Sequence, residues 1–479
     1  MGAGDYLYEG FRKHLGFEPT ACQDDLLRKI ADFSMTDEDL MVVNGYAGTG
    51  KTTAMAAVTA VLKENKIGVK LLAPTGRAAK VLSLYTGLPA FTIHKYIYRQ
   101  KSVSGDGFGE FSLGPNKDKD TLFIVDEVSL IGIDNQSANS GNGSAFGSGN
   151  LLEDLMSFVR KGPGCKVILV GDSAQLPPVG LDCSPALNHD YMVMLGATVF
   201  AELKTVTRQQ SESGILFNAT RLRECIGDGF DDMYQWDGEL HLMTDGFDDV
   251  ERITGGDLIE TISDAYSKYG EDDVIILTRS NKRAIRYNMG IRSTVQFKED
   301  RLVRDDKLMI VKNCYQFVSK LKDVDYIANG DIAKLVRISK YEDRYGLHFA
   351  EARLVLPDYD EQEFTAKVIL DTLDSESASL TYEQQNQLYH GVDADYGHIK
   401  NRRKRYAEVR EDPYFNALQL KYANAVTCHK SQGGQWKCVF IDNPFWQSDL
   451  TVDDMKWLYT AITRATEKVY LVNFKDELF

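Results

Sequence analysis

The stretch Gly45-Tyr46-Ala47-Gly48-Thr49-Gly50-Lys51-Thr52 matches the pattern G-x-x-x-x-G-K-[S/T]. It follows an apolar run at residues 41–44 and precedes a helical pattern over residues 52–64, which predicts a strand, a loop and a helix in that order. Glycines let such a loop surround phosphate oxygens with backbone N–H groups, and the helix N-terminus attracts anions. The alternative is a glycine-rich turn, but the flanking strand and helix favour a phosphate-binding loop.

The side chains of this loop, called the P-loop below, indicate which phosphate ligand fits. Lys51 can reach the β- and γ-phosphates of a nucleoside triphosphate, and the Thr52 hydroxyl can ligate Mg²⁺. We therefore expect ATP and Mg²⁺ as cofactors. The residues expected to hold the nucleotide are Gly45, Ala47, Gly48, Thr49, Gly50, Lys51, Thr52 and Thr53.

An acidic motif, Leu122-Phe123-Ile124-Val125-Asp126-Glu127, supplies the second half of the site. Its apolar residues predict a buried strand, and its two carboxylates follow the C-terminal end of that strand, where open α/β sheets bind ligands. We expect Asp126 to ligate Mg²⁺ together with Thr52, and Glu127 to polarise the attacking water. Helix-capping residues also follow strands, so the motif is informative only in combination with the P-loop.

The first half of the chain alternates apolar runs with helical patterns. Buried strands that alternate with helices predict a parallel sheet covered on both faces. These strands are expected at residues 41–44, 69–73, 122–125 and 167–170. The same signature returns in two separated parts of the chain and predicts a second α/β domain, with strands at residues 274–277, 439–441 and 469–472.

The segment between those parts differs in pattern, because strand-like pieces at residues 332–337 and 352–356 are followed by a polar helical stretch. It predicts an inserted β-rich module. We therefore expect a first domain over residues 1–200, a second over residues 201–290 and 421–479, and an insertion over residues 291–420.

Composition restricts the classes of function. The formal net charge of −15 argues against a passive DNA coat, which is usually basic, and requires any nucleic-acid track to be a local feature. There is no uninterrupted apolar stretch of about 18 residues and no secretory signal, so we expect no membrane contact. The seven cysteines lack the spacing of a zinc site, which favours reduced thiols in the cytoplasm.

Further motifs carry a family resemblance. They are Ala73-Pro74-Thr75-Gly76-Arg77-Ala78-Ala79-Lys80, Thr92-Ile93-His94, Gly171-Asp172-Ser173-Ala174-Gln175-Leu176-Pro177-Pro178-Val179-Gly180, Thr427-Cys428-His429-Lys430-Ser431-Gln432-Gly433 and Leu458-Tyr459-Thr460-Ala461-Ile462-Thr463-Arg464-Ala465. Together with the P-loop and the acidic motif, they resemble the superfamily 1 helicases of the RecD-like and phage Dda-like branch. The resemblance implies an α/β fold with two RecA-like P-loop NTPase domains, an inserted small SH3-like β-barrel, and a β-hairpin pin at residues 97–119.

The resemblance also implies roles at the nucleotide. Gln23 would read the adenine, Gln175 would sense the γ-phosphate, and Gln432 and Gly433 would border the nucleotide. Arg208 and Arg464 would be arginine fingers. The implied catalytic set is Lys51, Asp126, Glu127, Gln175, Arg208 and Arg464.

Candidate DNA contacts are mostly hydroxyl, amide, imidazole and lysine side chains. Such groups bind backbone phosphates and read no sequence, as a motor that grips any sequence requires. The set is Pro74, Thr75, Thr92, His94, Phe108, Asn281, Thr427, His429 and Lys430. For each hydroxyl residue the alternative is a helix cap.

Two segments leave alternatives open. In the pin, Phe108 or Phe111 would offer an apolar wedge to a base pair, unless the segment is merely a glycine-rich loop. The basic run at residues 400–405 is either a solvated helix face or a contact with DNA or a partner.

The sequence thus predicts an ATP-dependent 5′→3′ DNA helicase or translocase, with the polarity taken from the resemblance. One alternative is a translocase that displaces proteins from single strands with little unwinding, and another is a non-motor, ATP-dependent DNA-binding module. Expected partners are single-stranded DNA and forked or tailed duplex DNA, with a single-strand-binding protein or replication and repair factors. We expect a cytoplasmic, nucleoid-associated monomer of bacterial or phage origin.

Overall fold

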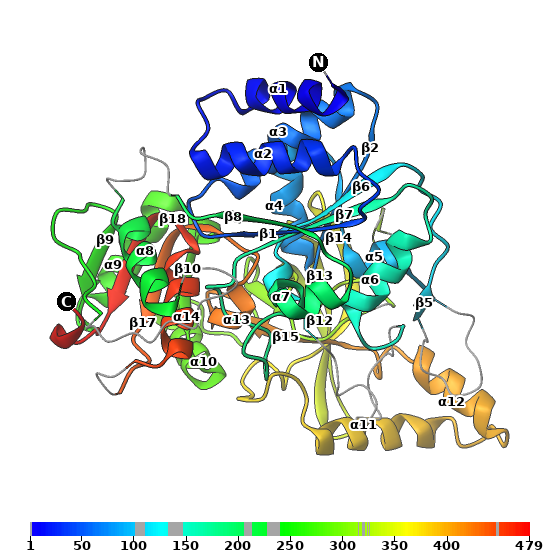
Figure 1. Ribbon diagram of the computed structural model, residues 1–479. Helices are drawn as coiled ribbons and strands as arrows, with labels where there is room; N and C mark the ends of the chain where they lie inside the picture. The colour runs from blue at the N-terminus through cyan, green and yellow to red at the C-terminus, as the bar shows by residue number, and fades with distance from the viewer. Residues whose placement is uncertain are drawn as a thin grey trace.

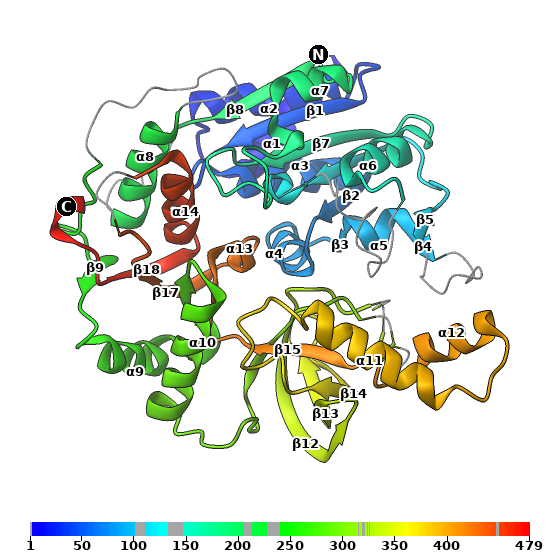
Figure 2. The same cartoon turned by 90° about the horizontal axis from the view of Figure 1, so that it is seen from below.

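The computed structural model describes residues 2–100, 111–132, 147–205, 213–227, 240–314, 316–318, 321–322, 324, 326–446 and 450–479. It contains two parallel sheets and a closed barrel, each with its own helices. We call the first sheet with its helices the first lobe and the second sheet with its helices the second lobe. The C-terminus lies in the second lobe, and the barrel lies beside both lobes (Figures 1 and 2).

The strands of the first-lobe sheet run parallel in the order β3-β2-β6-β7-β1-β8. Met41 and Val43 of β1, the second strand from one edge, pack on one face with the helices of residues 3–15, 21–33 and 51–64, whereas Leu40 and Val42 pack on the other with the helices of residues 93–97, 151–160 and 189–194. This burial on both faces explains the unbroken apolar runs in the sequence. The strands are β1 (Leu40–Gly45), β2 (Gly68–Ala73), β3 (Ala90–Thr92), β6 (Thr121–Val125), β7 (Lys166–Gly171) and β8 (Val199–Leu203).

Helices of the first lobe cover both faces of its sheet (Figure 1). They are α1 (Ala3–Leu15), α2 (Ala21–Phe33), α3 (Lys51–Glu64), α4 (Gly76–Thr86), α5 (Ile93–Ile97), α6 (Leu151–Arg160) and α7 (His189–Met194). The P-loop connects β1 to α3, because β1 ends at Gly45 and α3 begins at Lys51.

The second lobe has a parallel sheet in the order β16-β10-β17-β18-β9. Its strands are β9 (Val250–Ile253), β10 (Val274–Thr278), β16 (Ala425–Thr427), β17 (Trp436–Asp442) and β18 (Ala465–Val472). Its helices are α8 (Gly214–Ile226), α9 (Leu258–Tyr269), α10 (Asn281–Gly290), α13 (Cys428–Ser431) and α14 (Val452–Ile462). The strands come from two separated parts of the chain, so the predicted pair of α/β sheets is confirmed.

The inserted module is a closed barrel, also as predicted. Its strands are β11 (Lys307–Ile310), β12 (Ile332–Arg344), β13 (Leu347–Leu356), β14 (Gln362–Ile369) and β15 (Leu418–Tyr422). Helices α11 (Tyr382–Asp395) and α12 (Arg402–Glu411) form an arm on it, through a core that Leu347 and Phe349 share with Leu388 and Val409. In the basic run, residues 400–404 are exposed and Arg405 pairs with Asp393 at 2.8 Å.

Two predicted boundaries need correction. A boundary after residue 200 falls inside β8, and a boundary after residue 420 falls inside β15. Both strands continue past these boundaries: β8 pairs with β1 as far as Leu203, and β15 pairs with β11 as far as Tyr422. The ends of these strands are therefore the better boundaries. The functional division into these domains stays a prediction.

The predicted pin begins as an antiparallel hairpin of β4 (Tyr98–Gln100) and β5 (Phe111–Leu113). Phe111 is half-buried and packs against the core of the first lobe, which favours Phe108 over Phe111 as the predicted wedge. Phe108 lies outside the described residues. Within the described residues, no helix is both long enough and apolar enough to cross a membrane.

Candidate nucleotide cleft and nucleic-acid surface

A cleft of about 340 Å³ lies between the two lobes. The P-loop and the ends of β6 and β7 form its first-lobe side, and the segment after α14 forms part of its second-lobe side. The sequence-predicted residues that line it are Ala47, Gly48, Gly50, Lys51, Thr52, Thr53, Glu127, Gln175 and Arg464. The structure therefore brings most of the predicted nucleotide residues into one cavity.

Lys51 is held by the backbone of its own loop. Its ammonium donates to the carbonyl oxygens of Gly45 and Tyr46, the latter at 3.1 Å, and lies 3.8 Å from a carboxylate oxygen of Asp172. A Cβ at residue 45 would lie 2.7 Å from Lys51 Cγ, so only glycine at this position avoids a clash with the Lys51 side chain. Gly50 adopts a left-handed φ of 82°, which glycine tolerates best, and begins the turn into α3.

The acidic motif lies at the C-terminal end of β6. Glu127 has a left-handed φ of 56°, and its backbone N–H donates to the Asp126 carboxylate at 2.9 Å. Burial, then the neighbouring Glu127, raises the pKa of Asp126 to about 6, while the Lys51 charge opposes the rise. Carboxylate and hydroxyl oxygens, such as those of Asp126 and of Thr52 in the cleft lining, suit a hard cation such as Mg²⁺.

Arg464 reaches the cleft from the second lobe. It is 4% exposed, and its guanidinium donates to the carbonyl oxygens of Thr460 at 3.1 Å and Gly434 at 3.3 Å. Opposite it, Gln175 is 5% exposed, and its side-chain oxygen has no hydrogen-bond partner among the described residues. A buried amide oxygen without a donor indicates a missing polar ligand in the cleft.

Hydrogen bonds join the lobes beside the cleft. The Ala47 N–H donates to the Tyr459 hydroxyl at 2.8 Å, and that hydroxyl donates to Asp172 at 2.7 Å. The Leu176 N–H donates to the Thr460 hydroxyl at 2.8 Å, and the Gln432 amide donates to the Leu176 carbonyl at 2.7 Å. The loop after β7 is therefore held by two different segments of the second lobe.

Several predicted nucleotide residues do not line the cleft. Gln23 is fully buried, accepts from the Thr20 N–H at 3.0 Å and donates to the Thr49 carbonyl at 2.9 Å, so it supports the P-loop from behind. Gly433 lies against α4, where a Cβ would be 3.1 Å from the Thr75 hydroxyl. The others outside the lining are Gly45, Thr49, Asp126 and Gln432.

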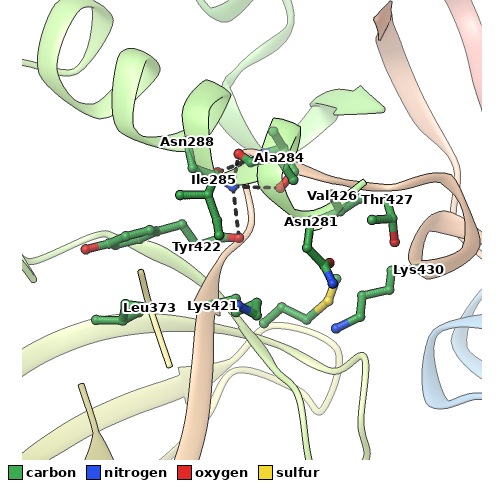
Figure 3. A pocket seen from close by; sticks show the side chains of 12 residues that line it. Asn281, Ala284, Ile285, Asn288, Leu373, Lys421, Tyr422, Val426, Thr427 and Lys430 are labelled. Carbon is green, nitrogen blue, oxygen red and sulfur yellow. Dashed lines mark hydrogen bonds between the residues drawn. The ribbon is translucent and has the colours of Figure 1, made fainter. Parts of the chain in front are cut away.

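Three predicted DNA contacts meet in a second pocket, where the second lobe joins the barrel. Asn281 of α10, Thr427 and Lys430 line it together with Lys421 of β15 (Figure 3). Asn288 joins α10 to both sides of this junction, because its amide donates to the carbonyl oxygens of Tyr422 in β15, at 3.3 Å, and Ala425 in β16, at 2.7 Å.

Burial lowers the pKa of both lysines of this pocket. Lys430 is affected by burial alone, whereas the pKa of Lys421 falls to about 8 through burial and then through repulsion from Lys430. Burial, then Arg279, lowers the pKa of His429. Two ammonium groups that line one pocket and are partly removed from water favour an anion between them.

The remaining predicted contacts sit at helix starts in the first lobe. Thr75 accepts the Ala78 N–H at 3.2 Å and Thr92 accepts the Lys95 N–H at 3.2 Å, so both hydroxyls cap helices. Thr92 also lines a cavity of about 400 Å³ between α4 and the barrel. Pro74 precedes α4, and His94 lies in α5 with its ring 5.7 Å from that of Tyr98.

Comparisons with known proteins agree with this arrangement. The family model of an AAA domain matches residues 20–139, and that of the UvrD-like helicase C-terminal domain matches residues 422–472. The chain is 36% identical to the ATP-dependent RecD2 DNA helicase of Deinococcus radiodurans over 29% of its length, and spans only 16% of that protein. It is 22% identical to the ATP-dependent DNA helicase dda of Enterobacteria phage T4, over 90% of the chain and 94% of the phage protein.

The chain is thus similar in sequence to the RecD2 and Dda DNA helicases. It also resembles a crystal structure of Pif1 helicase from Bacteroides in complex with ADP-AlF3 and single-stranded DNA, with 15% identity over 96% of this chain and 94% of that one, and a TM-score of 0.47. The predicted resemblance to RecD-like and Dda-like members of superfamily 1 is thus confirmed.

Two predicted site residues have no described position. Arg208 and Phe108 both lie outside the described residues. Their roles as arginine finger and wedge stay predictions.

The sequence motifs assigned no role to three side chains that the structure places at the two pockets or between the lobes. Tyr459 lies within a quoted motif, but only tertiary packing shows its hydroxyl at the P-loop. Lys421 belongs to no motif. Arg77 lies 4.0 Å from the ring of Trp436 across the lobes, and burial lowers its pKa.

Proposed function

We propose that the chain is an ATP-driven DNA helicase that moves along single-stranded DNA in the 5′→3′ direction and separates strands. One observation carries the proposal: Lys51 of the first lobe and Arg464 of the second line the same cleft. A nucleotide held there would be fully clamped only when both lobes contribute, so binding and release would be linked to lobe motion.

Each cleft residue has a proposed role. The P-loop amides and Lys51 bind the phosphates, Glu127 accepts a proton from the attacking water, and Arg464 stabilises negative charge in the transition state. The unpartnered side-chain oxygen of Gln175 would accept a hydrogen bond from the attacking water, and its amide N–H would donate to the terminal phosphate. Thr52 and Asp126 would hold Mg²⁺, which supplies neutralisation of the phosphate oxygens.

The proposed DNA track follows the helix starts of both lobes. Thr75 and Thr92 belong to the first lobe, whereas Asn281, Thr427 and Lys430 belong to the second. Because these groups suit backbone phosphates, the track would accept any sequence. Relative motion of the lobes would then become stepping, if each lobe grips the strand in turn. Names of the relatives support DNA as the substrate, and the polarity rests on the family resemblance.

The first test measures ATP hydrolysis with and without single-stranded DNA, for the wild type and for Lys51→Ala. We expect strong stimulation by DNA in the wild type and loss of hydrolysis in the variant. A wild type that hydrolyses ATP no faster with DNA would refute the motor and favour a non-motor binding module.

The second test uses duplexes with a single-stranded tail at either the 5′ or the 3′ end. We expect unwinding from the 5′ tail only, and unwinding confined to the 3′ tail would reverse the polarity. Stimulated hydrolysis with no unwinding of either duplex would indicate a translocase that displaces proteins.

A further inference from the structure

A buried tyrosine of the second lobe reaches the P-loop of the first. Tyr459 of α14 is 1% exposed, and its hydroxyl accepts the Ala47 N–H at 2.8 Å while donating to Asp172 at 2.7 Å. Burial, and then Asp172, raises the pKa of Tyr459 well above its ordinary value, so the hydroxyl stays protonated and available as a donor. One hydroxyl thus holds two loops of the other lobe.

Asp172 stands between this hydroxyl and the catalytic lysine. It is 1% exposed and accepts the Ala174 N–H at 3.0 Å, and its other oxygen lies 3.8 Å from the Lys51 ammonium. A buried carboxylate needs strong donors. If Tyr459 withdrew, Lys51 would be the nearest charged partner for Asp172.

We propose that Tyr459 is a positioning residue that satisfies Asp172 when α14 docks on the first lobe, and so leaves Lys51 available to the phosphates. This inference rests on the proposed function. When the lobes part, Asp172 draws Lys51 away from the phosphate position. Hydrolysis is therefore restricted to the closed arrangement.

The same docking event places the arginine finger. Thr460, the next residue of α14, accepts the Leu176 N–H at 2.8 Å, and its carbonyl oxygen accepts from Arg464 at 3.1 Å. The last turn of α14 thus carries both the hydroxyl that donates to Asp172 beside Lys51 and the carbonyl that holds Arg464. Both active-site cations respond to one movement.

The geometry separates this role from nucleotide binding. The N–H groups of Ala47 and Thr49 donate to the Tyr459 hydroxyl and the Tyr46 carbonyl, so both are engaged by the protein and neither is counted among the phosphate donors. Loss of the hydroxyl therefore alters the position of Lys51 and leaves the number of phosphate contacts unchanged. We expect kcat to change more than KM for ATP.

The decisive variant is Tyr459→Phe, which keeps the buried ring and removes only the hydroxyl. With saturating single-stranded DNA we expect kcat to fall about tenfold or more, the effect of losing a hydrogen bond to a charged group, while KM for ATP changes by less than about threefold. The matched control is Tyr287→Phe, because Tyr287 donates to Asp442 at 2.6 Å within the second lobe, away from the cleft. The control should retain kcat within about twofold.

A double-mutant cycle with Asp172→Asn tests the route of the effect. If Tyr459 acts through Asp172, adding Tyr459→Phe to Asp172→Asn should change kcat by less than about twofold. A full additional loss, or a normal kcat in Tyr459→Phe, would overturn the inference. Thermal midpoints checked alongside must stay near that of the wild type. Absence of DNA stimulation in the wild type would instead refute the proposed function.

Discussion

The nucleotide cleft and the lysine pocket on the track are built in different ways. In the cleft, Lys51 and Asp172 already have partners within the protein, and the two lobes meet through buried hydrogen bonds. In the track pocket, the Lys421 ammonium has only neutral partners, the backbone carbonyl oxygens of Thr372 and Ser375, and it is repelled by Lys430; burial lowers the pKa of both lysines. The cleft is organised before its ligand binds, whereas the track pocket holds repulsion that an anionic ligand would relieve.

The difference predicts that changes in the cleft act on catalysis and changes in the track pocket act on affinity. A single cleft residue positioned for the transition state can be worth several powers of ten in rate. A single phosphate contact is worth much less, because it is one of many along a strand.

The largest effect is expected for Arg464→Ala. The kcat for DNA-stimulated ATP hydrolysis should fall about 10³-fold, because the transition-state charge loses its second-lobe cation. Steady-state hydrolysis at saturating DNA measures this. Arg304→Ala is the control, because that side chain is 77% exposed beside the barrel. A loss below about tenfold would show that Arg464 is no arginine finger.

A smaller effect is expected for Lys430→Ala in the track pocket. Affinity for single-stranded DNA should fall several-fold, and the slope of log K against log salt should decrease in magnitude by about 0.7, as for one lost phosphate contact. Fluorescence anisotropy over a series of salt concentrations measures both. Lys268→Ala, on the outer helix α9, should leave the slope unchanged. An unchanged slope in Lys430→Ala would remove this pocket from the track.

The smallest effect concerns pH. Because the pKa of Lys421 is lowered to about 8, the fraction of charged side chain decreases as pH rises through 8. DNA affinity should therefore fall between about pH 7 and pH 9 in the wild type. Lys421→Arg stays charged throughout and should flatten this dependence. Parallel pH profiles for the two proteins would show that Lys421 does not contact the strand.

Much of the cleft was predictable because its chemistry is local in sequence. The P-loop needs glycine, lysine and threonine at fixed spacing, and Glu127 follows its strand directly, so Lys51, Thr52 and Glu127 were predicted to meet and do line one cavity. Gln23 shows the limit of this approach. Its side-chain oxygen accepts from the Thr20 N–H at the start of α2, and its amide N–H donates to the Thr49 carbonyl. Only the tertiary structure shows that the Gln23 side chain is already bonded within the protein.

The sequence by itself determined the strand and helix pattern, the P-loop and the family resemblance, because each depends on neighbouring residues or on a fixed spacing. Only the tertiary structure decided that Tyr459 touches Ala47 and that Lys421 joins Lys430, since these contacts link segments far apart in the chain. It also decided that Phe111 is half-buried against the core of the first lobe. Such contacts depend on how the lobes and the barrel pack against one another, and local sequence patterns do not predict that packing.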